Sequence, residues 1–161
     1  SESRGLGDVY KRQHLHMVDS WSPTAYEQAM DEAGFKNYLK RYGTIVKNNT
    51  VGGYKQYYEQ IWAHVNKKFR GKPVTLHRMT TDDFFRRFKE KVDWVFVDAL
   101  HTYDNCLKDL KNSLNIVKKG GSIYGDDYGV KPGTTKAVDE FIAGTGYTLD
   151  NFYKDQFEIK I

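Results

Sequence analysis

The sequence contains a single cysteine, Cys106, so it cannot form an internal disulfide, and nothing indicates an oxidising compartment. No apolar run approaches the roughly 20 residues that a membrane-spanning helix needs. The N-terminal stretch also lacks the apolar core of a secretory signal. These absences argue against a disulfide scaffold and predict a cytoplasmic protein with no membrane partner.

Positive charge is concentrated in one segment of a chain whose net charge is only +4. Residues 36–72 contain nine lysines or arginines and one acid, Glu59, with seven aromatic residues between them. Such a segment can bind nucleic acid through phosphate contacts and base stacking. A pair of helices with inward-packed aromatic residues and solvated lysines explains it better. A third use is a basic rim that admits an anionic substrate.

Short apolar runs alternate with helical patterns over residues 14–161. Strands are expected at 14–21, 74–79, 92–97, 122–124, 148–153 and 157–161. Helices are expected at 25–33, 35–42, 54–69, 81–88, 107–119 and 134–142, the last one capped by Thr134 or Thr135. This alternation predicts an α/β fold with a doubly wound, Rossmann-like sheet, mostly parallel and ending in an antiparallel C-terminal hairpin.

Acidic residues follow three of the predicted strands. Asp19 ends the first strand, Asp98 follows residues 92–97, and Asp126 and Asp127 follow residues 122–124. Ligands bind beyond the C-terminal ends of the strands in such a sheet. Asp19 is placed to accept hydrogen bonds from ribose hydroxyls, and the other three form an oxygen cluster of the kind that holds Mg²⁺. The alternative for Asp126 or Asp127 is a simple turn cap.

His101 lies three residues beyond Asp98. An imidazole with a pKa of about 6.5 can take a proton from a hydroxyl near neutral pH, which makes His101 the candidate general base. The other four histidines have no comparable partners nearby in the sequence, and we expect them on the surfaces of strands or helices: His14, His16, His64 and His77.

Two stretches resemble the fourth- and fifth-strand motifs of class I S-adenosylmethionine-dependent methyltransferases. They are Val-Asp-Trp-Val-Phe-Val-Asp-Ala-Leu-His-Thr-Tyr at 92–103, with Asp-Leu at 109–110, and Gly-Gly-Ser-Ile-Tyr-Gly-Asp-Asp at 120–127. The similarity is closest to the branch of metal-dependent sugar and macrolide O-methyltransferases and cephalosporin-hydroxylase-like proteins. Residues 15–21 resemble the second strand of that branch, and 134–141 resemble the helix after its fifth strand.

The resemblance implies methyl transfer from S-adenosyl-L-methionine to an oxygen of a small molecule, such as a sugar or natural product, with Mg²⁺ as an optional aid. The mild excess of basic residues in the chain would suit an anionic acceptor. The resemblance is also compatible with a homo-oligomer. The resemblance assigns His101 as base, Asp98, Asp126 and Asp127 as metal ligands, and Asp19, Met79, Thr80, Thr81 and Asp98 as cofactor contacts.

The family's first strand and glycine-rich loop have no counterpart here, since only four residues precede Gly5-Leu-Gly7. Residues 1–13 are polar and aperiodic and resemble translated adapter sequence. We therefore expect them to be a non-native or disordered leader. We also expect the chain to be an N-terminally truncated fragment with reduced or no activity. Residues 14–161 would form a single methyltransferase domain, with 22–72 as its lid or substrate segment. Pairing of 15–19 with 94–98, or recruitment of 8–13, could fill the place of the missing strand.

Two other functions compete with methyl transfer. A nicotinamide-dependent oxidoreductase would explain Asp19 but not the acids and histidine after the later strands. A non-catalytic nucleic-acid-binding domain would use residues 36–72 and would leave the acidic residues without a role. Methyl transfer accounts for both sets of residues.

Overall fold

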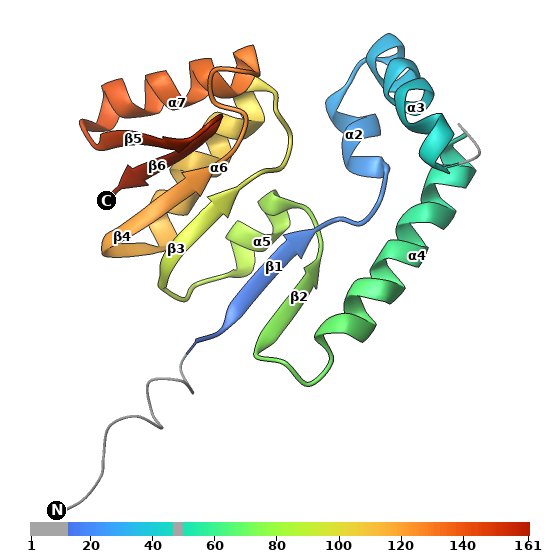
Figure 1. The fold of residues 1–161 in the computed structure, drawn as a ribbon, viewed down its shortest axis with the longest axis horizontal. Coiled ribbons are helices and arrows are strands. Elements are labelled where there is room, and N and C mark those ends of the chain that lie inside the picture. The colour runs from blue at the N-terminus through green and yellow to red at the C-terminus, as the bar shows by residue number, and fades with distance from the viewer. Residues whose placement is uncertain (1–12, 47–49) are drawn as a thin grey trace, which may run out of the picture. The chain divides into compact units, whose positions relative to one another are not determined.

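The computed structural model of the protein describes residues 13–46 and 50–161, with its helices and strands labelled in Figure 1. The chain falls into two units with their boundary between Thr80 and Thr81. The first unit contains a parallel pair of strands, β1 (Leu15–Asp19) and β2 (Val74–Arg78), in register from Leu15 opposite Val74 to Asp19 opposite Arg78. The connection between them contains α2 (Thr24–Ala29), α3 (Glu32–Val46) and α4 (Val51–Phe69).

Helix α4 is amphipathic in the predicted way. The Thr50 side chain accepts a hydrogen bond from the backbone N–H of Gly53 and so caps the helix. Apolar and aromatic residues at helical spacing form its less exposed face: Tyr54, Tyr58, Ile61, Trp62, Val65 and Phe69. Lys55, Lys67 and Lys68 on this helix are exposed. In the described residues, the basic segment is therefore a helical one with solvated lysines and inward aromatic side chains.

Tyr38 on α3 lies at the centre of an aromatic cluster that joins the helices of the first unit. Its ring stacks on Tyr26 at 4.4 Å between centroids, and its hydroxyl lies 2.9 Å from that of Tyr58. The hydroxyl of Tyr54 donates to the carbonyl of Leu39 at 2.8 Å. Burial, together with the Tyr58 hydrogen bond, raises the pKa of Tyr38, so its phenol stays neutral.

The second unit is a four-stranded mixed sheet in the order β3-β4-β6-β5. The strands are β3 (Val92–Val97), β4 (Val117–Gly125), β5 (Thr148–Tyr153) and β6 (Gln156–Lys160). Strands β3 and β4 are parallel, whereas β6 is antiparallel to both β4 and β5. The helices of this unit are α5 (Thr81–Arg87), α6 (Tyr103–Ile116) and α7 (Pro132–Thr145).

The core of the second unit lies between its sheet and the helices α6 and α7. The fully buried side chains of Leu110, Ile123, Val138, Phe157 and Ile159 belong to one cluster that draws on α6, β4, α7 and β6. This core fixes β3 and β4 side by side, so that the turns after both strands emerge at one edge of the sheet.

The α/β class and the C-terminal hairpin are confirmed by the structure, which has one two-stranded and one four-stranded sheet in the described residues. Among the described residues, β1 pairs with β2 in the first unit and β3 pairs with β4 in the second. The suggested pairing of 15–19 with 94–98 would join the two units and stays a prediction. The other suggestion, recruitment of residues 8–13, lies mostly outside the described residues. Within 13–46 and 50–161, no helix combines the length and apolarity required to cross a bilayer.

Several predicted boundaries are wrong, and the end of α6 shows why. Helix α6 stops at Ile116 and β4 starts at Val117, earlier than predicted, because the buried Val117 side chain joins the core and its backbone turns extended. Lys118 then pairs with Asp93 instead of closing the helix. Helix α3 also runs through Gly43, beyond the predicted end at Tyr42.

The predicted start of α7 is also wrong. The helix begins at Pro132 after Lys131, so Thr134 and Thr135 lie inside its first turn and do not cap it. Proline suits the first position because its fixed φ is helical and the N–H that it lacks has no helical partner there. The Thr135 hydroxyl instead accepts from the N–H of Gly129 at 2.9 Å and donates to the carbonyl of Lys131 at 3.0 Å.

Candidate active site

Asp98, His101 and Asp127 meet where β3 and β4 end. His101 Nε2 lies 3.3 Å from Asp98 Oδ1 and 2.9 Å from Asp127 Oδ2. One atom from each of the three side chains lies within 4.8 Å of the others, as in a site able to hold a metal ion. Adjacent parallel strands deliver these residues to one edge, which places an imidazole between two carboxylates.

Asp126 and Asp127 have different surroundings although they are neighbours in sequence. Asp127 has a φ of 65°, a left-handed conformation that aspartate tolerates better than most residues. Its carbonyl accepts hydrogen bonds from the N–H groups of Val130 and Lys131, so the residue shapes the turn as well as facing His101. Asp126 is not part of the three-residue cluster. Its Oδ1 atom is buried and has no hydrogen-bond partner among the described residues.

The donor set fits a small divalent cation. Two carboxylates and an imidazole converge, and an adjacent buried carboxylate oxygen lacks a partner, which is costly unless a cation or a proton satisfies it. Hard oxygen donors of this kind suit Mg²⁺, which also keeps several water ligands. Asp98 and Asp127 are the first candidates to hold it, with Asp126 beside them.

Gly133 brings the first turn of α7 against the backbone beside His101. A Cβ atom at this position would lie 2.4 Å from the carbonyl oxygen of His101 and 2.9 Å from the N–H nitrogen of Tyr103. Only glycine allows this approach without displacing the backbone. Sequence reasoning missed Gly133, because its role comes from a contact with a segment about thirty residues earlier in the chain.

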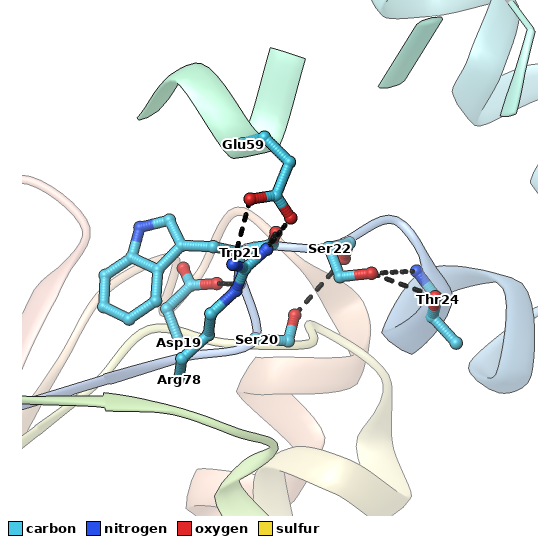
Figure 2. Close-up of polar contacts among 7 residues, drawn as sticks. All are labelled: Asp19, Ser20, Trp21, Ser22, Thr24, Glu59 and Arg78. Carbon is cyan, nitrogen blue, oxygen red and sulfur yellow. Dashed lines mark hydrogen bonds and ion pairs between the residues drawn. The ribbon is translucent and has the colours of Figure 1, made fainter. Parts of the chain in front are cut away.

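In the first unit, Asp19 ends β1 in a hydrogen-bonded turn (Figure 2). Its Oδ1 accepts a hydrogen bond from the backbone N–H of Trp21 at 2.6 Å. The residue is exposed as a whole, but the atoms packed around its carboxyl raise its pKa by desolvation, and the Trp21 hydrogen bond opposes that rise. Trp21 itself is buried and has a φ of 42°, an unusual conformation for a bulky residue.

Arg78 at the end of β2 holds the chain after Asp19 (Figure 2). Its guanidinium donates to both carboxylate oxygens of Glu59 on α4 and to the carbonyl of Trp21 at 3.4 Å. The same group lies 5.3 Å from the centroid of the Trp62 ring, which packs on Trp21 at 4.8 Å. Arg78 and Glu59 were not predicted, since their partners lie on separate elements.

The other predicted cofactor contacts lie on different elements. The N–H of Met79 donates to the carbonyl of Asp19 at 3.0 Å, so Met79 and Thr80 follow directly after the strand beside Asp19. Thr81 starts α5 in the second unit, and its hydroxyl bonds to the buried carboxylate of Asp109. Asp98, the remaining predicted cofactor contact, belongs to the cluster with His101.

A strand-end acid in a βαβ-like unit, and an acid–histidine cluster at the edge of a parallel pair, are arrangements typical of α/β proteins that bind nucleotide cofactors. The sequence model of the methyltransferase domain family matches residues 3–128. The chain thus belongs to the class I S-adenosylmethionine-dependent methyltransferases. No curated protein matches it in sequence.

Two solved structures show the same fold. The O-methyltransferase NovP matches with a TM-score of 0.58 and 17% identity, over 95% of this chain and 62% of its own. CalS11, a TDP-rhamnose 3′-O-methyltransferase in calicheamicin biosynthesis, matches with a TM-score of 0.51 and 13% identity, over 94% of this chain and 73% of its own. The chain therefore spans less than two thirds of NovP.

Proposed function

We propose that the protein transfers a methyl group from S-adenosyl-L-methionine to an oxygen of a small-molecule acceptor. The observation that carries this proposal is His101 held between Asp98 and Asp127 at the shared edge of β3 and β4. The family match supports the cofactor, and the likeness to two O-methyltransferases supports oxygen as the acceptor atom.

The cofactor would supply an electrophilic methyl group on a sulfonium. His101 would take the proton of the acceptor hydroxyl as its oxygen forms the new bond. Asp98 and Asp127 would stabilise the positive charge that the imidazole gains. A magnesium ion, if held by these carboxylates and Asp126, would supply further polarisation of the hydroxyl. Asp19 would accept hydrogen bonds from the ribose, with Met79, Thr80 and Thr81 beside the adenine.

The acceptor class follows from weaker support. CalS11 acts on a nucleotide-linked sugar, and the described lysines of α4 are exposed. We infer that an anionic sugar or natural-product-like acceptor is used, with residues 22–72 forming the substrate wall. The chain would act within a single methyltransferase domain over residues 14–161.

Calorimetric titration of S-adenosylhomocysteine tests the cofactor assignment, with NADH as the competing ligand. We expect S-adenosylhomocysteine to bind and NADH not to bind. Asp19→Asn should weaken the binding, whereas Asp150→Asn, which alters an acid paired with Lys160, should leave it unchanged. Binding of NADH without S-adenosylhomocysteine would instead establish the oxidoreductase alternative.

Transfer of a labelled methyl group to a panel of sugar acceptors tests the role of His101. A general base contributes typically 10²–10⁴-fold to the rate, so His101→Asn should lower kcat by about that factor. His64→Asn, which changes an exposed histidine on α4, is the matched control. Equal activity of the two variants would remove His101 from the mechanism.

A further inference from the structure

Three of the five histidines lie on one face of the β1–β2 pair, far in sequence from the cluster of Asp98, His101 and Asp127. His14 precedes β1 and His16 lies within it, and alternate residues of an extended chain point to the same face. His16 is opposite Thr75 in the register, so His77, two residues further along β2, occupies the diagonal position on that face.

The spacing of these rings is that of imidazoles around one metal ion. His16 Nδ1 and His77 Nε2 are 2.9 Å apart, and the ring centroids are 5.2 Å apart. The centroids of His14 and His16 are 4.9 Å apart. Two imidazoles on a tetrahedral Zn²⁺, with bonds of about 2.0–2.1 Å, have nitrogens about 3.3 Å apart and ring centres about 5 Å apart. The His16–His77 pair needs to open by only about 0.4 Å to reach that geometry.

His14 has the outer hydrogen bond that metal-binding histidines commonly make. Its Nε2 lies 2.7 Å from the hydroxyl oxygen of Thr75, which leaves Nδ1 as the ligand atom. The ligand atoms of the three histidines do not all lie within 4.8 Å of one another, a spacing that only the cluster of Asp98, His101 and Asp127 meets within the described residues. His14 is exposed at the start of β1, so its ring is able to turn toward the other two.

We propose that His14, His16 and His77 form a transition-metal site of the Zn²⁺ class that links β1 to β2. Neutral imidazole suits zinc, nickel and copper, whereas Mg²⁺ prefers the oxygen donors of the carboxylate cluster. A two-stranded pair is weakly stable by itself, so a metal bound across it would stabilise the ladder that ends in Asp19.

Titration of Co²⁺ and Zn²⁺ into the purified chain tests this site, with Co²⁺ absorption reporting the coordination and calorimetry the stoichiometry. We expect one Zn²⁺ per chain, tetrahedral Co²⁺ bands, and a rise in Tm with Zn²⁺. His14→Gln, His16→Gln and His77→Gln should each weaken Zn²⁺ binding by at least about tenfold and abolish the rise in Tm. His64→Gln, which changes an exposed histidine on α4 outside both clusters, is the matched control and should bind as the parent chain does.

Two results would overturn the proposal. One is loss of Zn²⁺ binding in His101→Gln with retention in His16→Gln and His77→Gln, which would move the ion to the carboxylate cluster. The other is absence of stoichiometric binding at micromolar Zn²⁺ in the parent chain. Circular dichroism of each metal-free variant separates loss of a ligand from loss of the fold, and none of these measurements depends on methyl transfer.

Discussion

At the scale of single residues, the candidate active site depends on the absence of a Cβ atom at Gly133. Gly133 lets the first turn of α7 approach the His101 carbonyl, where a Cβ would lie at 2.4 Å. The position of His101 therefore requires glycine at 133. A search of the sequence for catalytic or metal-binding side chains does not find this residue.

Gly133→Ala should destabilise the protein by about 1–3 kcal/mol, the usual cost of forcing atoms into a packed site. Gly144→Ala is the matched control on the same helix, because a Cβ there meets nothing within 4 Å. That variant should be neutral or more stable by up to about 1 kcal/mol, since alanine favours helix. Urea denaturation measures both, and the His101 imidazole resonances should shift in Gly133→Ala alone. Equal effects of the two variants would contradict the close approach.

Asp109 gives the stability of the protein a dependence on pH. Burial raises the pKa of its carboxyl to about 6, against the lowering effect of the Thr81 hydrogen bond. Between about pH 4 and 6 the folded chain thus holds a proton that the unfolded chain has released, so the free energy of unfolding contributed by Asp109 falls as pH rises and levels off above 6. A shift of about two pKa units corresponds to at most roughly 3 kcal/mol.

Asp109→Asn should remove this dependence. The difference in unfolding free energy between the parent chain and the variant should change by up to about 3 kcal/mol from pH 4 to pH 6.5, in favour of the variant at the higher pH. Urea titrations at both pH values measure it, with Asp104→Asn, an exposed acid on the same helix, as control. A difference that stays constant with pH would contradict the raised pKa.

At the scale of elements, Arg78 connects the end of β2 to α4 and to the turn after β1. Its bonds to Glu59 and to the Trp21 carbonyl hold Trp21 in its left-handed conformation, and the Trp21 N–H in turn fixes the Asp19 carboxylate. The orientation of Asp19, the residue expected to bind the ribose, is therefore set by Arg78 on another strand.

Arg78→Gln should weaken the binding of S-adenosylhomocysteine, because the Asp19 carboxylate would lose its fixed orientation. Arg86→Gln is a suitable control, since Arg86 pairs with Asp83 on the same helix and is largely exposed. Calorimetry gives the affinities, and indole fluorescence reports the environment of Trp21 and Trp62. Unchanged affinity in Arg78→Gln would restrict Arg78 to a structural role.

Elements were predictable from sequence where periodicity and burial agree, as in α4 and the β5–β6 hairpin. Boundaries failed where a distant contact decides, as at Val117, whose burial in the core ends α6 early. The strand-end acids could be located because topology alone brings Asp98 and Asp127 to one edge. The Arg78 network and the close approach of Gly133 could not, since each joins elements far apart in sequence.

At the scale of the whole molecule, the described part of the basic segment 36–72 includes three exposed lysines on α4: Lys55, Lys67 and Lys68. The aromatic residues of the same helix lie on its less exposed face. Any association with nucleic acid should then be electrostatic and weak.

Fluorescence anisotropy with a labelled oligonucleotide tests this expectation. Binding should fall steeply between 50 and 200 mM salt, as expected for phosphate contacts, and Asp98→Ala should leave it unchanged. Lys67→Gln with Lys68→Gln should reduce whatever binding remains at low salt. Tight binding that persists at high salt would favour the nucleic-acid-binding alternative over methyl transfer.

The long connection between β1 and β2 has a consequence for the order in which the chain folds. Leu15 pairs with Val74 across three helices, whereas β5 and β6 meet through a tight turn. Contacts between distant residues carry a large loop-closure cost and form slowly, while a local hairpin forms within microseconds. The turn that presents Asp19 should therefore become protected from hydrogen exchange late in folding, after the hairpin of the second unit.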